Sequence, residues 1–432
     1  MKLLSFIVSA TIVINSGSAA FGQSVTHLAV NEARSARSLF EEADGYLHRK
    51  YREFNQQKVP FDPKLEQKTK QEQKELAAEN AKLLVAREPL RGDDLYYLGM
   101  LHHLSSDPQS AFSAMRRFLK PEPTGETAQL ARAVLVVSAI KNNLLSEAEA
   151  AVGVYRESEP LNLQELYGME TLLTDAFHKA KNHERMAVHA QGMLDTARRA
   201  SDAGKAVSFR RDEMLYKAAS FLAEAQLKAN NKDAAIATLK EINKIALALP
   251  SGNLHRLVKR RVNTVDPGVE LWELATSTTL NVPVPDLVST EWLDGTAKKL
   301  AEFKGRVVLL DFWAPWCGPC RVTLPQLQKW HEEFKDRGLV ILGVTNYSGH
   351  AEGKMLSQTE ELAYLKAFKT RNRLTYPFVI ADSSVNDRNY GVISIPISFL
   401  LDRNGNMRFI SAGASQEELA ALGKMIKKLI EE

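Results

Sequence analysis

Cysteine is scarce in this 432-residue sequence, which contains only Cys317 and Cys320. So few cysteines exclude a small secreted domain held together by several disulfides. An excess of one charge is also lacking, because 56 Lys and Arg residues stand against 52 Asp and Glu residues, a net charge of +4. This balance gives no reason to expect nucleic acid as a partner. With 44% apolar residues, the chain is long enough for two or three globular domains.

An uninterrupted apolar run long enough to span a bilayer, roughly 20 residues, is absent too. The N-terminal run from Leu3 to Ile14 is shorter, follows the basic start Met1-Lys2 and precedes small residues that end near Gly22. This order is typical of a secretory signal peptide. We therefore expect residues 1–22 to be a signal peptide, with an uncleaved anchor as the alternative. The remaining chain is expected to be secreted, into a bacterial periplasm, where thiols tend to be oxidised.

Strand-like alternation is missing from residues 23–274, where apolar residues recur at three- and four-residue spacing. We predict an all-α helical domain over this range. It contains a loose internal repeat, in which Leu98-Gly99, Ala111 and Pro123 correspond to Leu135-Val136, Ala148 and Pro160. Small residues at such positions let paired helices approach closely, so the region resembles tetratricopeptide-like repeats, with an irregular helical bundle as the alternative. Either arrangement offers a groove to a protein partner.

A basic cluster lies near the end of this helical region and consists of His255, Arg256, Lys259, Arg260 and Arg261. We expect it to be the solvated end of a helix, where cations interact favourably with the helix dipole. A role in binding a partner or a membrane surface is the alternative.

From residue 275 onward, short apolar runs alternate with helical patterns. They predict strands at 306–313, 339–345, 376–381, 397–401 and 407–410, and helices at 318–335, 359–369 and 415–430. Asn404-Gly405 predicts a tight hairpin between the last two strands. Parallel buried strands with crossover helices, followed by an antiparallel hairpin, make an α/β sandwich. We therefore assign residues 275–432 to a linker and a second, α/β domain.

Both cysteines lie in the pentapeptide Trp316-Cys-Gly-Pro-Cys320, which follows a predicted strand and opens a predicted helix. At a helix N-terminus the free N–H groups and the dipole favour the thiolate of Cys317. A thiolate is the species that attacks a disulfide. Cys320, one turn into the helix, is expected to be more buried and to resolve the mixed disulfide. Pro319 is compatible with the first helical turn.

Two other interpretations of the cysteine pair are much less favoured. Half of a zinc site would need two more ligands, and the C-terminal part offers only His331 and His350. A purely structural disulfide across two intervening residues closes too small a loop to stabilise a fold much. We therefore expect no metal and no dissociable cofactor. The other eight histidines show no ligand spacing, and we expect them at the surface.

The stretch from Asp311 to Arg321, Asp-Phe-Trp-Ala-Pro-Trp-Cys-Gly-Pro-Cys-Arg, resembles the active-site segment of the thioredoxin superfamily. The segments Phe303–Leu310 and Val284–Gly295 narrow the resemblance to secreted, membrane-facing thiol-disulfide oxidoreductases of the TlpA/ResA type. It covers about residues 282–432 and implies a thioredoxin fold there.

The resemblance also implies roles for individual residues. Asp311 matches a buried acid that moves protons to and from Cys320, with a pKa raised by desolvation. Ile395-Pro396 matches a loop in which a cis-proline lies against the cysteine pair and a backbone strand pairs with an extended substrate. The candidate catalytic residues are thus Cys317, Cys320, Asp311 and Pro396, and the candidate substrate-binding residues are Trp316, Ile395, Gly318 and Pro319. Trp313 is expected in the core.

These observations lead to one main functional hypothesis. We expect an extracytoplasmic thiol-disulfide oxidoreductase that reduces protein disulfides and is reset by a redox partner, while the helical domain engages a further protein. Two other functions stay open: a disulfide oxidase or isomerase, and an interaction scaffold with a redox-sensing domain.

Overall fold

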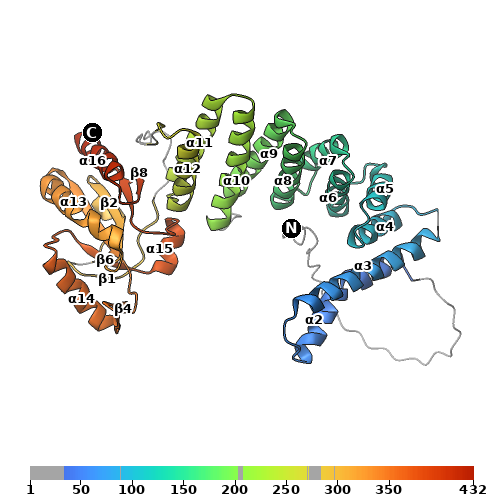
Figure 1. The fold of residues 1–432 in the computed structure, drawn as a ribbon, viewed down its shortest axis with the longest axis horizontal. Helices are drawn as coiled ribbons and strands as arrows, with labels where there is room; N and C mark the ends of the chain where they lie inside the picture. The colour runs from blue at the N-terminus through green and yellow to red at the C-terminus, as the bar shows by residue number, and fades with distance from the viewer. Residues whose placement is uncertain (1–33, 88, 203–207, 270, 272–283, 296) are drawn as a thin grey trace. The chain divides into compact units, whose positions relative to one another are not determined.

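The computed structural model describes residues 34–432 apart from 88, 203–207, 270, 272–283 and 296 (Figure 1). The expected signal peptide and the expected domain boundary after residue 274 lie outside the described residues. Up to residue 265 the described chain is helical, and beyond it strands and helices alternate, which confirms the predicted fold class. The chain divides into two compact units, Met1–Thr196 and Ala197–Glu432, within helix α9 (His183–Asp202). No helix in the described ranges is long and apolar enough to cross a membrane.

The first unit is built of helices that follow one another along the chain. They are α1 (Ala36–Asp44), α2 (Tyr46–Gln56), α3 (Pro63–Val85), α4 (Asp93–Leu104), α5 (Pro108–Leu119), α6 (Glu126–Lys141), α7 (Leu145–Glu157), α8 (Leu163–Lys179) and the first part of α9. Pro123 and Pro160 lie in the connections between helices, as predicted. A Cβ on Gly99 would lie 2.8 Å from the Met115 side chain, so this glycine lets α4 and α5 approach closely. The likeness to tetratricopeptide repeats stays a prediction.

The expectation that the histidines without ligand spacing lie at the surface is wrong for His189 and His255, which are both buried. On α9, His189 Nδ1 lies 2.7 Å from Glu170 Oε2, and its Nε2 lies 2.9 Å from Glu149 Oε1. The two carboxylates come from α8 and α7, so the local sequence around the histidine carries no sign of them.

The second unit begins with a helical layer, α10 (Ser208–Lys228), α11 (Lys232–Ala248) and α12 (Gly252–Val265). The basic cluster lies in α12, and its expected position at a solvated helix end is wrong for four of its five residues. His255 is fully buried and its Nδ1 lies 2.7 Å from Asn243 Oδ1, while Arg256 and Lys259 are half-buried. Arg261 is half-buried as well, and Arg260 is exposed as expected. The sequence did not indicate this burial because it results from tertiary packing: this face of α12 packs on the sheet described next.

The strands of the second unit are β1 (Ser289–Trp292), β2 (Val307–Phe312), β3 (Leu339–Thr345), β4 (His350–Ala351), β5 (Lys354–Met355), β6 (Phe378–Ala381), β7 (Ile397–Leu401) and β8 (Met407–Ala412). Six of them form one sheet in the order β1-β6-β3-β2-β7-β8, and β4 and β5 pair separately. Strands β2, β3 and β6 are parallel, whereas β1, β7 and β8 pair antiparallel with their neighbours. The predicted parallel strands and terminal hairpin are thus confirmed.

Both faces of this sheet are covered, because successive side chains of β2 and β3 point alternately to two buried clusters. One cluster joins Leu309 to α13 (Gly318–Phe334), α14 (Gln358–Arg371) and α16 (Gln416–Glu431). The other joins Val308 and Leu310 to Tyr390 and Val392, which follow α15 (Ser383–Asn389), and to Leu247 of α11. The helical layer therefore contributes directly to the core on one side of the sheet.

Candidate active site

The two cysteines lie where β2 leads into α13. Cys317 is the N-cap of α13, and its Sγ accepts a hydrogen bond from the Cys320 backbone N–H at 3.2 Å. The two residues are joined by a disulfide, and both are buried. After reduction, the same N–H groups and the positive end of the helix dipole face the Cys317 sulfur, which favours its thiolate. This position suits the predicted role of Cys317 as the attacking thiol, which stays a prediction.

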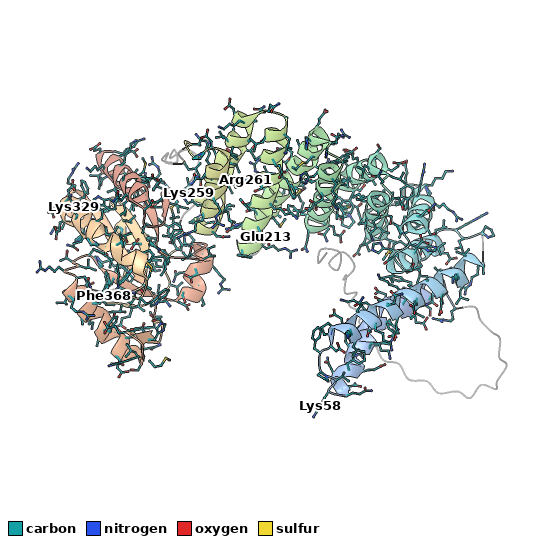
Figure 2. All side chains as sticks on the ribbon, in the orientation of Figure 1. Lys58, Glu213, Lys259, Arg261, Lys329 and Phe368 are labelled. Carbon is teal, nitrogen blue, oxygen red and sulfur yellow. A yellow bond between two sulfur atoms is a disulfide. The ribbon has the colours of Figure 1, made fainter. Side chains whose placement is uncertain are left out.

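The residues around the disulfide differ sharply in exposure. Trp316 is 57% exposed, and Gly318 and Pro319 are exposed as well, so they form a surface beside the buried sulfur atoms. Trp313, in contrast, is buried against the rings of Phe368 (labelled in Figure 2) and Phe378, with centroids 5.3 and 4.9 Å away. The expected core position of Trp313 is confirmed.

Asp311 lies on β2 in register with Ser398 of β7 and is only 1% exposed. The Ser398 hydroxyl donates a hydrogen bond to Asp311 Oδ1 at 2.7 Å, while Oδ2 is buried with no partner in the described parts of the chain. Burial raises the pKa of Asp311 to about 6, although the hydrogen bond from Ser398 opposes the shift. This carboxyl can therefore take up and release a proton near neutral pH.

Sequence reasoning missed two polar residues near this carboxyl. One is Ser398, whose only sequence signal is its place two residues after Pro396, on the same strand. The other is Tyr376, which is buried and whose hydroxyl has no partner within the described residues. Burial and the charge of Asp311 raise the pKa of Tyr376 well above its ordinary value, so its hydroxyl keeps its proton.

The Ile395–Pro396 loop precedes β7, and its peptide bond is cis. Ile395 packs against the buried cluster that contains Cys317 and Cys320. The Pro396 carbonyl accepts a hydrogen bond from Gly413 N–H at 3.1 Å, but the backbone N–H and carbonyl of Ile395 have no partner in the described ranges. The structure thus brings this loop to the disulfide with one residue's backbone donor and acceptor unused.

A cavity of about 220 Å³, which we call the redox cleft, opens beside these residues. Its lining includes Trp316 after β2, Asn346 after β3, and Ile393 and Ile395 before β7. Among the described residues, no group of three or more His, Cys, Asp or Glu side chains is arranged to hold a metal ion.

Comparison with known proteins places this site in a family. The AhpC/TSA family matches residues 280–410. Thioredoxin-like protein YneN of Bacillus subtilis (strain 168) is 33% identical over 129 residues, which cover 30% of this chain and 69% of that protein. Thiol-disulfide oxidoreductase ResA of Bacillus thuringiensis subsp. konkukian is 30% identical over 143 residues, 33% of this chain and 75% of that protein.

A solved structure of a thiol:disulfide interchange protein from Chlorobium tepidum TLS is 23% identical, covering 34% of this chain and 95% of that one, with a TM-score of 0.28. The two Bacillus relatives are matched over more than two thirds of their length. With this identity, and with a Cys-Gly-Pro-Cys disulfide at the start of α13, the chain belongs to the thioredoxin-like thiol-disulfide oxidoreductases.

Proposed function

We propose that this oxidoreductase reduces disulfides of other proteins outside the cytoplasm. The observation that carries the proposal is Asp311, a buried carboxyl with a raised pKa on the strand that leads into the redox helix. A base of this kind is ionised at neutral pH and can accept the proton of the resolving thiol. The extracytoplasmic location rests on the signal-peptide pattern of residues 1–22.

The proposed reaction has two steps. The Cys317 thiolate attacks one sulfur of a substrate disulfide, so that a mixed disulfide forms and one substrate thiolate leaves. Asp311 then accepts the proton of Cys320, whose thiolate attacks the Cys317 sulfur. This second attack releases the other substrate thiolate and leaves the Cys317–Cys320 disulfide. Two electrons have then passed to the substrate, and a thiol donor must return two electrons to start the next cycle.

The substrate chain is proposed to bind beside Ile395. Its backbone N–H and carbonyl, which have no partner among the described residues, suit the pairing of one residue of an extended polypeptide, which then lies next to the disulfide. The exposed surface of Trp316, Gly318 and Pro319 is proposed to contact the same chain. Protein partners on the helices of the first unit belong to the proposal as well, since helical layers of this kind offer grooves to peptides.

Turnover with insulin as a disulfide substrate tests this function. With dithiothreitol as the donor, the full-length protein is expected to reduce insulin, and Cys317→Ser is expected to abolish the activity. Cys320→Ser is expected to accumulate a mixed disulfide between Cys317 and insulin, because the second attack is lost.

An unreactive reduced enzyme would contradict the proposed direction, most clearly if the oxidised enzyme instead formed disulfides in a reduced test protein. That result would assign an oxidase or isomerase. Asp336→Asn, at an exposed carboxyl, serves as a matched control for any carboxyl substitution.

A further inference from the structure

Helix α12 contacts the loop that carries Pro396. The Gly252 N–H donates a hydrogen bond to the Tyr390 carbonyl at 2.9 Å. A Cβ on Gly252 would lie 2.3 Å from Ile397 Cδ1, so the absence of a side chain permits this close approach. Lys259, one of the residues labelled in Figure 2, forms an ion pair with the buried Glu418 of α16. The helical layer is therefore fixed to the redox-active part of the second unit at several points.

Arg256 of α12 makes the most direct contact with the substrate side of this loop. Its guanidinium donates hydrogen bonds to the carbonyls of Ser394, at 2.9 Å, and of Pro396, at 2.8 Å. These carbonyls flank Ile395, whose own N–H and carbonyl stay unpaired within the described chain. A charged planar group with several donors can hold both carbonyls in one geometry. Arg256 thus holds the loop on both sides of Ile395, the residue proposed to pair with a substrate.

A second cavity lies on the helical layer and shares one lining residue with the redox cleft. This cavity, which we call the helical groove, has a volume of about 690 Å³. Its lining includes Phe209, Tyr216 and Phe221 of α10 and Leu257 of α12. Ile393 lines both the helical groove and the redox cleft, so the two cavities meet at this side chain.

Large exposed apolar side chains follow the same path. Trp316 at the disulfide is 57% exposed, Ile393 at the junction is 59% exposed, and Phe209 in the helical groove is 64% exposed. Contiguous exposed apolar residues of this kind mark interaction sites on soluble proteins. Charged groups also line the groove, including Glu213 on α10 and Arg261 on α12 (both labelled in Figure 2).

We propose that the helical groove extends the substrate-binding site and holds a polypeptide segment next to the reacting cysteine, with apolar side chains packed against Phe209 and Ile393. The proposal rests on the proposed function, because it assigns the occupant of the same site. A polypeptide fits better than a small disulfide, since the path runs from the sulfur atoms past an unpaired backbone donor and acceptor to an apolar surface. The enzyme then prefers unfolded chains that carry large apolar residues near their cysteines.

The rate of mixed-disulfide formation tests this proposal. In the full-length Cys320→Ser variant, Cys317 keeps a free thiol. Two short peptides are prepared, each with one cysteine linked to thionitrobenzoate; one has Leu and Phe on both sides of the cysteine, and the other has Ser and Gly. Attack of the Cys317 thiolate on the peptide sulfur forms the Cys317–peptide disulfide and releases coloured thionitrobenzoate, so the colour reports the rate.

We expect the apolar peptide to react about tenfold faster than the polar one, since packing one or two large side chains has this effect. Adding Phe209→Ser or Ile393→Ser should abolish the preference, so that the two peptides react at equal rates. Met355→Ser, at an apolar side chain that is 85% exposed on β5, is the matched control and should keep the preference.

Equal rates for the two peptides, or a preference that survives both groove substitutions, would overturn the helical groove as a substrate site. A change in sedimentation on Phe209→Ser without a change in peptide rates would assign the groove to a second copy of this chain instead. No release of thionitrobenzoate from either peptide is a different failure. It would overturn the proposed nucleophile Cys317, and the groove proposal with it.

Discussion

Replacing Asp311 by Asn gives a quantitative test of the buried carboxyl. Because its folded-state pKa of about 6 lies above the ordinary value of 3.8, the folded protein binds the proton more tightly than the unfolded chain. The resulting stabilisation is fully present below about pH 3.8 and is lost as the pH rises through about 6. A shift of this size corresponds to about 3 kcal/mol. Most of this amount falls between about pH 4 and 7.

The Asp311→Asn protein has no titrating group at this position and keeps an oxygen that can accept the Ser398 hydrogen bond. Relative to the parent, its free energy of unfolding should therefore increase by about 2 to 3 kcal/mol when the pH is raised from about 4 to 7. Taking the difference between the two proteins removes the contributions of all other titrating groups that the substitution does not affect.

Guanidinium unfolding of the oxidised proteins, followed by tryptophan fluorescence, measures this difference. All five tryptophans lie at or after position 272, so the signal reports the redox-active part of the chain rather than the N-terminal helices. Asp336→Asn, an exposed carboxyl, should show no comparable pH-dependent difference. A difference between Asp311→Asn and the parent that stays constant from pH 4 to 7 would refute the raised pKa.

Three further predictions concern the reaction and the contact of α12 with the loop. Turnover with insulin should rise with pH through about 6 as Asp311 ionises, and Asp311→Asn should remove this rise in a pH-rate profile. Arg256→Gln should raise KM for insulin about five- to tenfold and leave the reduction potential unchanged, and Arg256→Lys should recover part of this loss. Equal KM values for Arg256→Gln and the parent protein would show that the two hydrogen bonds do not position the loop. In denaturant titrations, Gly252→Ala should lower the free energy of unfolding by about 1 to 3 kcal/mol because its Cβ meets Ile397. Gly153→Ala, whose Cβ would meet no atom of the described chain within 4 Å beyond its own helix backbone, should be neutral or stabilising by up to about 1 kcal/mol.

The central strands were predictable because burial on both faces leaves a strong sequence signal. The continuous apolar runs of β2 and β3 and the Asn404-Gly405 turn between β7 and β8 each identify their element locally. Strand β1 was not predicted as a strand, because the half-exposed sequence Ser-Thr-Glu-Trp carries neither alternation nor an apolar run. Its pairing with β6 depends on a partner that lies about 90 residues later in the chain.

The same distinction applies to the site. Cys317 and Cys320 were identifiable because their motif is local and lies between a strand and a helix. The Asp311–Ser398 hydrogen bond joins residues 87 apart, and the Arg256–Pro396 hydrogen bond joins residues 140 apart. Such contacts arise from packing of elements that are distant in sequence. For this reason the basic residues of α12 looked like a solvated surface, although Arg256 and Lys259 contact the redox-active part of the chain.

The reduction potential of the Cys317/Cys320 pair tests the central claim most directly. Oxidised and reduced full-length protein can be equilibrated in dithiothreitol buffers and quantified by the fluorescence change of Trp316, next to the disulfide. A reductase is expected to have a potential near that of thioredoxin, about −270 mV. A potential well above about −200 mV would contradict the reducing direction and assign the enzyme to disulfide formation or isomerisation.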